Sequence, residues 1–401
     1  MNSRTTTEQQ TLSEYNRART LQYLHHHGIA SRAQIAKALH LTPAALSKIS
    51  NHLLASGAIV ETGALEGKGN RRSIGLAVNA RAFQVLGVKF ARSLIEIGLF
   101  DLAGKPSFIR ELPTVENTTI PQAIESLHAE IRRLLAEHPH ILAIGMAVPG
   151  PYLRDRGHTA VVSSMGQWRQ VNFRAEFEHA FDVPVIIEQD ARAGALAQYL
   201  FDPNPANENL AYYLLGEGIG LGVIDHGTVI NGSLGAATEI GHVSIDVNGK
   251  ACDCGNVGCL ERYCSAVAIH EAMLGNGMLA TDSRLTHREA SAELFARAQS
   301  GDGQARELVE RIGTFVGYGC VTICNAFNPS RIVIGDIVAQ AGEPLLQRVR
   351  EVVGERVIPE ITQSTQIELS ALPTDAAVTG AAAVAITYIL DHPSQFFASG
   401  T

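Results

Sequence analysis

The sequence has no run of apolar residues long enough to cross a bilayer. A membrane-spanning helix needs roughly 20 such residues, whereas the most apolar stretch extends only from Ala376 to Leu390. This stretch lies between Asp375 and Asp391 and predicts a buried helix. The N-terminus has no basic segment followed by an apolar one, so no signal peptide is expected. We therefore expect a cytoplasmic protein without a membrane partner.

Cysteine is scarce, with 6 residues in a chain of 401. Three of the six cluster tightly, as metal ligands do in reduced proteins. Hydrophobic residues make up 46% of the chain and charged residues 18%, which is an ordinary globular composition with enough apolar material for a large core. The length predicts two or three domains.

Positive charge is depleted everywhere except at the N-terminal end. Residues 1–80 contain nine Lys or Arg and four Asp or Glu, whereas residues 81–401 contain 23 and 36, so net charges of +5 and −13 give the overall −8. A basic head on an acidic body is typical of a DNA-binding module joined to a metabolite-binding domain. Chance scatter of charge would give the same totals, so the charge alone does not decide.

The first 57 residues predict three helices. The first ends near Gly28, the second begins after the N-cap Ser31, and the third begins at Pro43 after the N-cap Thr42 and ends at Gly57. The three histidines His25–His27 indicate a solvated helix end rather than a metal site.

A hairpin is expected next, with strands at residues 58–62 and 74–78 and a glycine-rich, basic turn between them. Three helices and such a wing resemble the winged helix-turn-helix of bacterial regulators; the competing interpretation is a small helical dimerisation cap. The expected DNA contacts lie on the outer face of the third helix and in the wing. They are Thr42, Ala44, Ala45, Ser47, Lys48, Asn51, His52, Lys68, Arg71 and Arg72.

The remaining sequence has an α/β pattern in which two passages are alike. Residues 85–104 and 212–228 each predict a strand, a turn and a second strand, followed by alternating helices and strands. Two similar lobes that each open with a hairpin resemble the actin/hexokinase-like fold, in which ligand lies in the cleft between the lobes. We expect residues 1–80 to form the DNA-binding domain and 81–401 the two-lobed domain. Its small lobe spans about 84–190 plus the C-terminal helix, and its large lobe about 191–375.

A metal site is predicted between His242 and Glu261. One imidazole and three thiols occur within 18 residues, and two glycines allow the loop to turn sharply. Zinc accepts this tetrahedral set of His242, Cys252, Cys254 and Cys259, whereas the alternative is a group of free thiols. Because four protein ligands close the coordination shell, we expect the zinc to be structural rather than catalytic.

Four motifs resemble the ROK family of repressors and sugar kinases: GMAVPG (145–150), EQDARAGALAQ (188–198), GEGIGLGVIDHGTVINGSLGAATEIGH (216–242) and CDCGNVGCLE (252–261). The resemblance implies a sugar in the interlobe cleft. The matching positions for its ligands are Gln189, Asp190, Glu239, His242 and Glu261. Carboxylates accept strong hydrogen bonds from hydroxyl groups, and a zinc-bound histidine still has a free ring nitrogen. The competing interpretation of Asp190 and Glu239 is a salt-bridged structural carboxylate.

The chain departs from the kinases of the family where they bind phosphate. Their D-x-G-G-T hairpin corresponds to GVKFARS (87–93), which lacks the acid, the paired glycines and the threonine, and their G-T-G-x-G corresponds to GEGIG, with Glu217 in the hydroxyl position. A carboxylate there repels phosphate by about 4 kcal/mol per unit charge at ~4 Å and an effective dielectric near 20. Gln189 and Thr238 also replace the usual Asn and Gly, which leaves the identity of the sugar open.

We therefore expect a transcriptional regulator, acting as a repressor of carbohydrate metabolism, and not an enzyme. Its expected partners are operator DNA, a sugar or sugar derivative, and further copies of the same chain in a homodimer or homotetramer. One alternative is an ATP-dependent sugar kinase with an added DNA-binding domain. Another is a regulator controlled by a protein partner, which the sequence does not separate from sugar sensing.

Overall fold

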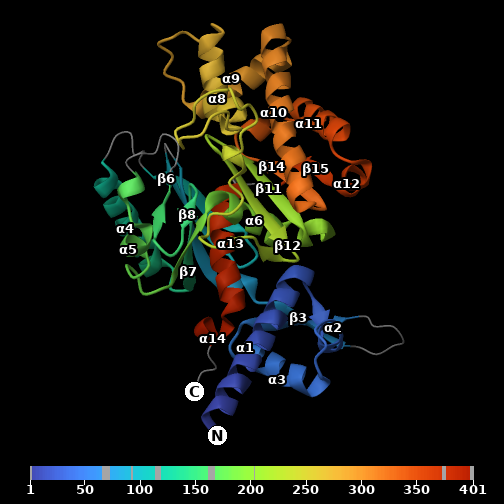
Figure 1. Ribbon diagram of the computed structural model, residues 1–401. Helices are drawn as coiled ribbons and strands as arrows, with labels where there is room; N and C mark the ends of the chain where they lie inside the picture. The colour runs from blue at the N-terminus through green and yellow to red at the C-terminus, as the bar shows by residue number, and fades with distance from the viewer. Residues whose placement is uncertain are drawn as a thin grey trace.

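The computed structural model consists of a head and two lobes (Figure 1). It describes residues 2–65, 73–91, 94–112, 119–160, 168–202, 204–372 and 376–397. Across these ranges, none of the helices is long and apolar enough to span a membrane.

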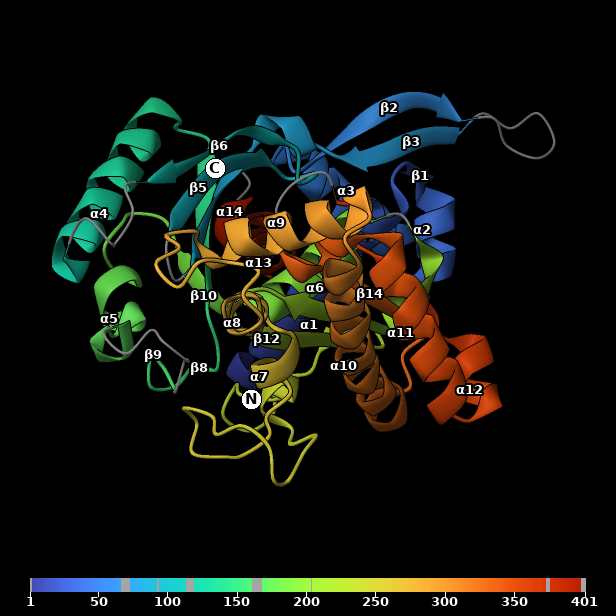
Figure 2. The same cartoon turned by 90° about the horizontal axis from the view of Figure 1, so that it is seen from above.

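The head contains three helices and a small antiparallel sheet. The helices are α1 (Asn2–His27), α2 (Arg32–Ala38) and α3 (Pro43–Ala55), and the sheet has the order β1-β3-β2, formed by Ala30–Ser31, Ser73–Val78 and Ile59–Leu65. Strands β2 and β3 project away from the rest of the molecule (Figure 2). The three helices and the hairpin confirm the sequence prediction, whereas the two-residue strand β1 was not predicted because no periodicity can be detected over that length.

Local capping explains where the head helices begin. The Ser31 side chain accepts a hydrogen bond from the Gln34 backbone N–H, and the Gln34 side-chain oxygen accepts one from the Ser31 backbone N–H, which completes a capping box. The Thr42 hydroxyl accepts from the Ala45 N–H at 3.2 Å, and Pro43 occupies the first helical position.

The first lobe is built on a five-stranded sheet of order β10-β7-β4-β5-β6. Its strands are β4 (Gln84–Phe90), β5 (Ile95–Asp101), β6 (Pro106–Leu112), β7 (Ile141–Val148) and β10 (Val185–Gln189). Helices α4 (Ile120–Glu137) and α5 (Phe173–Phe177) pack with one apolar cluster of this lobe. The small strands β8 (Tyr152–Leu153) and β9 (His158–Thr159) pair beside them.

The second lobe repeats this plan with the strand order β13-β12-β11-β14-β15. Its strands are β11 (Leu210–Leu215), β12 (Ile219–Asp225), β13 (Thr228–Val229), β14 (Arg331–Gly335) and β15 (Gln366–Leu369). Its helices are α7 (Glu261–Cys264), α8 (Ala266–Gly275), α9 (His287–Ser300), α10 (Gly303–Phe327), α11 (Glu343–Arg356) and α12 (Pro359–Ser364). Cys320 and Cys324 are buried on α10, as expected for small core residues. The two hairpins β4–β5 and β11–β12 confirm the predicted internal similarity.

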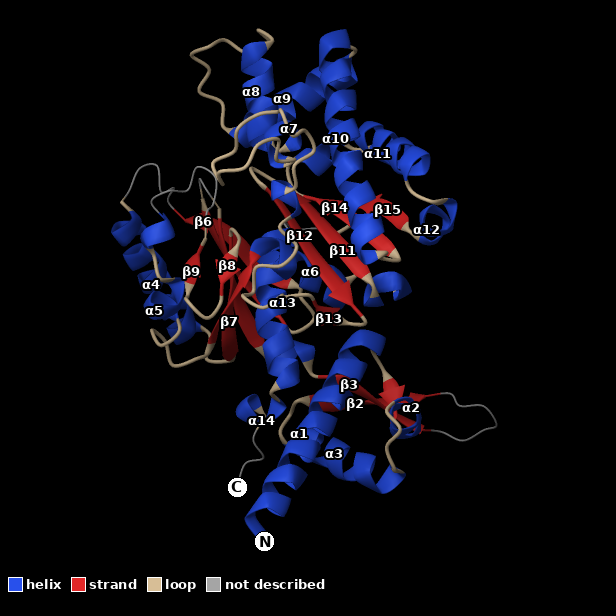
Figure 3. Ribbon diagram, in the orientation of Figure 1, coloured by secondary structure: helices blue, strands red, loops and turns tan. Residues whose placement is uncertain are grey.

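Two helices lie between the two sheets (Figure 3). Helix α6 (Asp190–Phe201) packs on strands β11 and β12 of the second lobe, and α13 (Ala376–Asp391) packs on β4 and β7 of the first. The two helices also pack extensively on each other. Helix α13 is the apolar stretch predicted as a buried helix, and α14 (Pro393–Phe396) follows it.

The head docks on the body through the C-terminal half of α1. Its core side chains belong to the same apolar cluster as Val85 and Phe100 of the first lobe and Val378 and Ile386 of α13. His25 Nε2 lies 2.8 Å from the backbone oxygen of Leu102. The expectation of a solvated helix end is therefore wrong for His25, because the body covers its imidazole and desolvation lowers its pKa, whereas His26 and His27 are exposed.

Candidate functional site

Strand β10 is followed at once by α6, and the expected sugar-binding residues Gln189 and Asp190 lie at this junction. Gln189 is the N-cap of α6, where its side chain accepts a hydrogen bond from the Arg192 N–H, and Asp190 is the first helical residue. The Asp190 Oδ1 accepts from the Ala191 N–H at 2.7 Å. Asp190 keeps some exposure but is densely surrounded by protein, and desolvation raises its pKa to about 7, with a further contribution from Asp336.

The structure brings three of the predicted carboxylates together. Burial raises the pKa of Glu239 to about 8, and the charges of Asp190 and Glu261 add to this increase. Glu239 Oε1 is buried without a hydrogen-bond partner among the described residues. Glu261 is 8% exposed, and its Oε2 faces Gly218, where an added Cβ would lie 3.5 Å away. A buried acceptor with no partner is costly, which suits a ligand that supplies hydroxyl donors.

Arg192 is a buried cation in this cluster that the sequence analysis missed. It is 0% exposed, and its Nε donates to Glu188 Oε1 at 2.8 Å, while Arg154 donates to the other oxygen of Glu188 at 2.6 Å. Its charge counteracts the increase in the pKa of Asp190 and Glu239. The available signal was an arginine on an otherwise small and apolar helix, which requires an acidic partner.

The four predicted metal ligands converge. One donor atom from each of His242, Cys252, Cys254 and Cys259 lies within 4.8 Å of the others. The Sγ atoms of Cys254 and Cys259 are 3.6 Å apart, and Cys252 Sγ is 3.9 Å from His242 Nδ1. Ligands at ~2.3 Å from a tetrahedral ion are separated by about 3.8 Å, so the donor set fits zinc.

Backbone geometry holds this loop in place. Gly255 and Gly258 have φ angles of 90° and 75°, which favour glycine. A Cβ on Gly258 would also approach the Asp246 carbonyl oxygen to 1.7 Å. The loop therefore needs glycine at this position both for backbone conformation and for space.

The region that corresponds to the kinase phosphate hairpin is occupied by side chains. Lys89 is 5% exposed, and its Nζ lies 3.5 Å from Glu96 Oε2 on the neighbouring strand. Phe90 packs edge-on against Trp168 and Phe173. The last two residues of the 87–93 segment lie outside the described residues.

A second acidic residue beside the glycine-rich turn at 216–220 is evident only in the structure. Asp336 follows strand β14 with a φ angle of 73°, a conformation that normally favours glycine. A Cβ on Gly216 would lie 2.7 Å from its carboxylate, and Arg288 lies 3.7 Å from its other oxygen. Together with Glu217, Asp336 places negative charge beside the second glycine-rich turn. A polar residue directly after a buried strand was the available sequence signal.

Most of the predicted contacts on α3 face solvent. Thr42, Ala44, Ser47, Lys48 and Asn51 are exposed, and Ala45 and His52 are half-buried, whereas Leu46, Ile49 and Leu53 face the core. The predicted wing contacts Lys68, Arg71 and Arg72 lie outside the residues that the structure describes.

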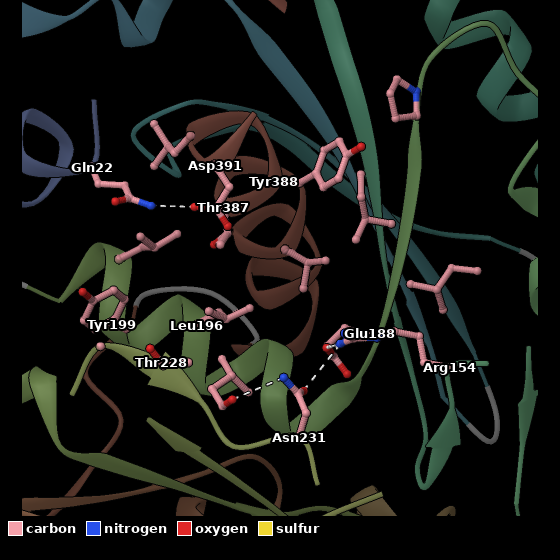
Figure 4. A pocket seen from close by; sticks show the side chains of 18 of the residues that line it. Gln22, Arg154, Glu188, Leu196, Tyr199, Thr228, Asn231, Thr387, Tyr388 and Asp391 are labelled. Atoms are coloured by element: carbon pink, nitrogen blue, oxygen red, sulfur yellow. Dashed lines mark hydrogen bonds and ion pairs between the residues drawn. The ribbon is translucent and has the colours of Figure 1, made fainter. Parts of the chain in front are cut away.

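A large cavity, whose lining does not include Asp190, Glu239 or Glu261, lies against the head (Figure 4). Its volume is about 1240 Å³, and its walls come from α1, α13, β10 and the β12–β13 turn. Gln22, Glu188, Tyr199 and Asp391 are among the residues that line it. The cavity thus borders the head and both lobes.

Comparison with known proteins agrees with the division into a head and a two-lobed body. Residues 85–388 match the ROK family. The xylose repressor of Caldicellulosiruptor bescii is 28% identical over 391 residues, which cover 95% of this chain and 98% of that repressor.

Two solved structures are similar. A ROK family transcriptional regulator, described as a homolog of the E. coli MLC protein, has a TM-score of 0.79 at 26% identity and covers 95% of this chain and 97% of its own. The ROK hexokinase from Thermus thermophilus has a TM-score of 0.63 at 27% identity and covers 77% of this chain and 100% of its own. The match to the regulator therefore extends further along this chain than the match to the hexokinase.

Proposed function

Because the chain belongs to the ROK family, we propose that it is a DNA-binding transcriptional regulator, acting as a repressor of carbohydrate metabolism. A sugar or sugar derivative in the interlobe cleft controls it. One observation carries this proposal: the cleft keeps a cluster of carboxylates suited to hydroxyl groups, while side chains fill the region where a kinase holds phosphate. We place this activity in the cytoplasm, where the DNA is accessible.

The head is proposed to be a winged helix-turn-helix. Supporting this, α3 begins at a capped N-terminus, buries one face and exposes small polar side chains with Lys48 on the other. A helix of this kind fits the major groove, where short side chains reach base edges. Two copies related by a two-fold axis, in a homodimer or homotetramer, would read a palindromic operator.

The effector contacts are proposed to be Gln189, Asp190, Glu239, His242 and Glu261. The convergence of the carboxylates and the buried unpartnered Glu239 Oε1 support this. Gln189 is 1% exposed and caps α6, so its contribution is to hold Asp190 at the helix start as well as to shape the pocket.

Zinc is proposed at His242, Cys252, Cys254 and Cys259, where it would supply a structural cross-link and no open coordination position. Nδ1 of His242 faces the thiols, so Nε2 remains available to donate to a sugar hydroxyl. Cys252 Sγ lies 3.6 Å from Glu261 Oε1, so the metal loop and the effector cluster are in direct contact. The loop therefore holds one wall of the effector site.

A sugar kinase is the second candidate, because the body is similar to a hexokinase. Phosphoryl transfer depends on positioning and on neutralising phosphate charge. Here the Lys89 ammonium is held by Glu96, and Asp336 and Glu217 add negative charge at the facing turn. Asp190 occupies the place of a general base, but a base without a phosphate donor performs no chemistry.

Two assays separate these functions. In a gel-shift series with DNA from the chain's own promoter region, we expect a specific complex whose affinity changes with one member of a panel of hexoses, pentoses, amino sugars and their phosphates. A coupled assay with ATP, magnesium and the same sugars should give no turnover. No DNA complex under any condition, or robust ATP-dependent turnover, would contradict the proposal; an effect of a transport protein in place of any sugar would indicate control by a protein partner.

A further inference from the structure

We propose that helix α1 contacts both lobes, on either side of the interface between α6 and α13, and thereby transmits lobe closure to the head. The inference rests on the proposed function, since it specifies how an effector bound between the lobes changes the position of the DNA-binding helices. It follows from two observations: each lobe carries one of the helices α6 and α13, and α1 contacts both of these helices.

Helix α6 packs on the second lobe so closely that the glycines at the contact leave no room for a side chain. A Cβ on Gly222 would lie 2.3 Å from the Ala191 carbonyl oxygen, and one on Gly194 would lie 2.3 Å from the Tyr212 ring. Helix α13 is seated on the first lobe in the same way, because a Cβ on Gly145 would lie 1.8 Å from the Ala381 carbonyl oxygen. Each helix is therefore fixed to its own sheet.

The contact between α6 and α13 is made by small residues. Gly380 approaches the backbone of Ala193 so closely that a Cβ there would lie 2.5 Å away, and Ala191, Ala195 and Ala383 share the same buried cluster. Packed helices with few interlocking side chains can slide past each other in a shear motion. When the lobes close around a ligand, α6 and α13 must therefore move relative to each other at this interface.

The C-terminal half of α1 touches both sides of this interface. His26 stacks on Tyr199 of α6, with ring centroids 5.7 Å apart and an interplanar angle of 22°. Tyr199 moves with the second lobe, since its hydroxyl lies 2.9 Å from the position of a Cβ on Gly227 in the β12–β13 turn. On the other side, Gln22 donates to Asp391 of α13 at 2.6 Å.

Further contacts anchor α1 to the first-lobe side. Ser394, next to α13, donates its N–H to Glu14 at 3.0 Å and accepts from Arg17 at 2.9 Å. His25 binds the Leu102 carbonyl oxygen of the first lobe. The first lobe thus holds α1 along its length, while α6 reaches its C-terminal end through Tyr199.

Helix α6 connects this end to the effector site. It begins at Asp190 in the cleft and ends at Phe201, a distance of roughly 18 Å at 1.5 Å per residue. A displacement of the cleft end therefore displaces Tyr199. The cavity of about 1240 Å³ lies against the same contacts, so the junction has room to change (Figure 4).

The consequence is that α1 cannot keep both sets of contacts when the lobes rotate. Either the His26–Tyr199 stack separates or α1 turns relative to the first lobe, and α3 turns with it because both helices share the head core. The contacts of Gln22 and His26 are exposed, so their loss costs little stability and variants at these positions should fold.

The test uses full-length His26→Ala and Gln22→Ala variants, with His27→Ala as the matched control, since exposed His27 contacts Tyr23 of its own helix. D-glucose, D-xylose and N-acetyl-D-glucosamine serve as probes, and promoter affinity is measured with and without each. Allosteric coupling is typically 5–150-fold. We expect His27→Ala to keep the wild-type response, and His26→Ala to bind both the sugar, by thermal shift, and DNA while the response falls below about two-fold.

The outcomes distinguish the bridging role of α1 from the proposed function. A wild-type response retained in full by both His26→Ala and Gln22→Ala overturns the bridging role of α1 and leaves the proposed function standing. A wild-type protein that fails to bind the promoter DNA, or binds it without responding to any sugar or sugar phosphate of the full panel, overturns the proposed function and this inference with it.

Discussion

At the scale of single residues, the cleft combines carboxyl groups that are expensive to ionise. Burial raises the pKa of Asp190 from 3.8 to about 7 and that of Glu239 from 4.5 to about 8. Such groups retain protons in the folded chain that the unfolded chain has already released. This cost is tolerated where a ligand uses the site, because hydroxyl donors can replace the missing solvation.

The first prediction concerns pH and stability. Between about pH 4 and pH 7 the folded state binds more protons at Asp190 than the unfolded state, so stability falls as pH rises through this window. At ~1.4 kcal/mol per pKa unit, reduced because Asp190 is partly exposed, the difference should be on the order of 2–3 kcal/mol. Asp190→Asn should remove it in urea unfolding at pH 5 and pH 8, whereas the exposed control Asp282→Asn should not. If Asp190→Asn keeps the wild-type difference in stability between pH 5 and pH 8, this carboxyl is not desolvated.

The second prediction concerns sugar affinity. Glu239→Gln replaces one carboxyl oxygen by an amide NH2 group, which cannot accept a hydrogen bond, and leaving a buried partner unsatisfied costs about 1–3 kcal/mol, so the effector should bind roughly 5–150-fold more weakly. Calorimetric titration checks this, with the exposed Glu271→Gln as a control that keeps wild-type affinity. Equal affinities of Glu239→Gln and wild type would place the effector elsewhere.

At the scale of elements, the metal loop is the clearest case of sequence predicting geometry. The third prediction is that Cys254→Ser loses its zinc and lowers the melting temperature by roughly 5 °C or more. Cys320→Ala is the matched control, because it also removes a thiol from the second lobe but from α10. Metal analysis and thermal melting measure both. If Cys254→Ser keeps a full equivalent of zinc, the proposed ligand set is wrong.

The fourth prediction concerns α3. Lys48→Ala removes an exposed cation from the proposed DNA-facing side, so the slope of log affinity against log salt should decrease by about 0.9. Lys37→Ala on α2 is the control, as it leaves the α3 surface intact. Fluorescence anisotropy at several salt concentrations gives the slope. A larger effect from Lys37 than from Lys48 would indicate that α3 does not face the DNA.

Sequence reasoning was reliable where the signal is local. The caps Ser31 and Thr42 identified two helix starts, and the spacing of one histidine and three cysteines predicted that their donor atoms converge. It was unreliable where a distant segment decides the outcome. His25 is buried because the β5–β6 turn covers it, and Asp336 matters because it lies against Gly216. Neither relation leaves a trace in neighbouring residues.

At the scale of the whole molecule, the head is not a separate appendage. Residues of its core share one apolar cluster with the first lobe and α13, so the head and the body are packed together. The proposed domain boundary near residue 80 therefore marks a change of architecture, and the head before it is not packed independently of the body. This continuity is what a regulator needs, because effector binding must alter a distant surface.

Reciprocal titration tests the central claim most directly. The effector sugar is titrated into the protein alone and into its complex with promoter DNA, in the presence of ATP and magnesium. Coupling between two binding sites is reciprocal. We expect the sugar affinity to differ by about 5–150-fold between the two titrations, with the sugar recovered unchanged. Identical affinities, or a phosphorylated sugar in the recovered sample, would contradict the account.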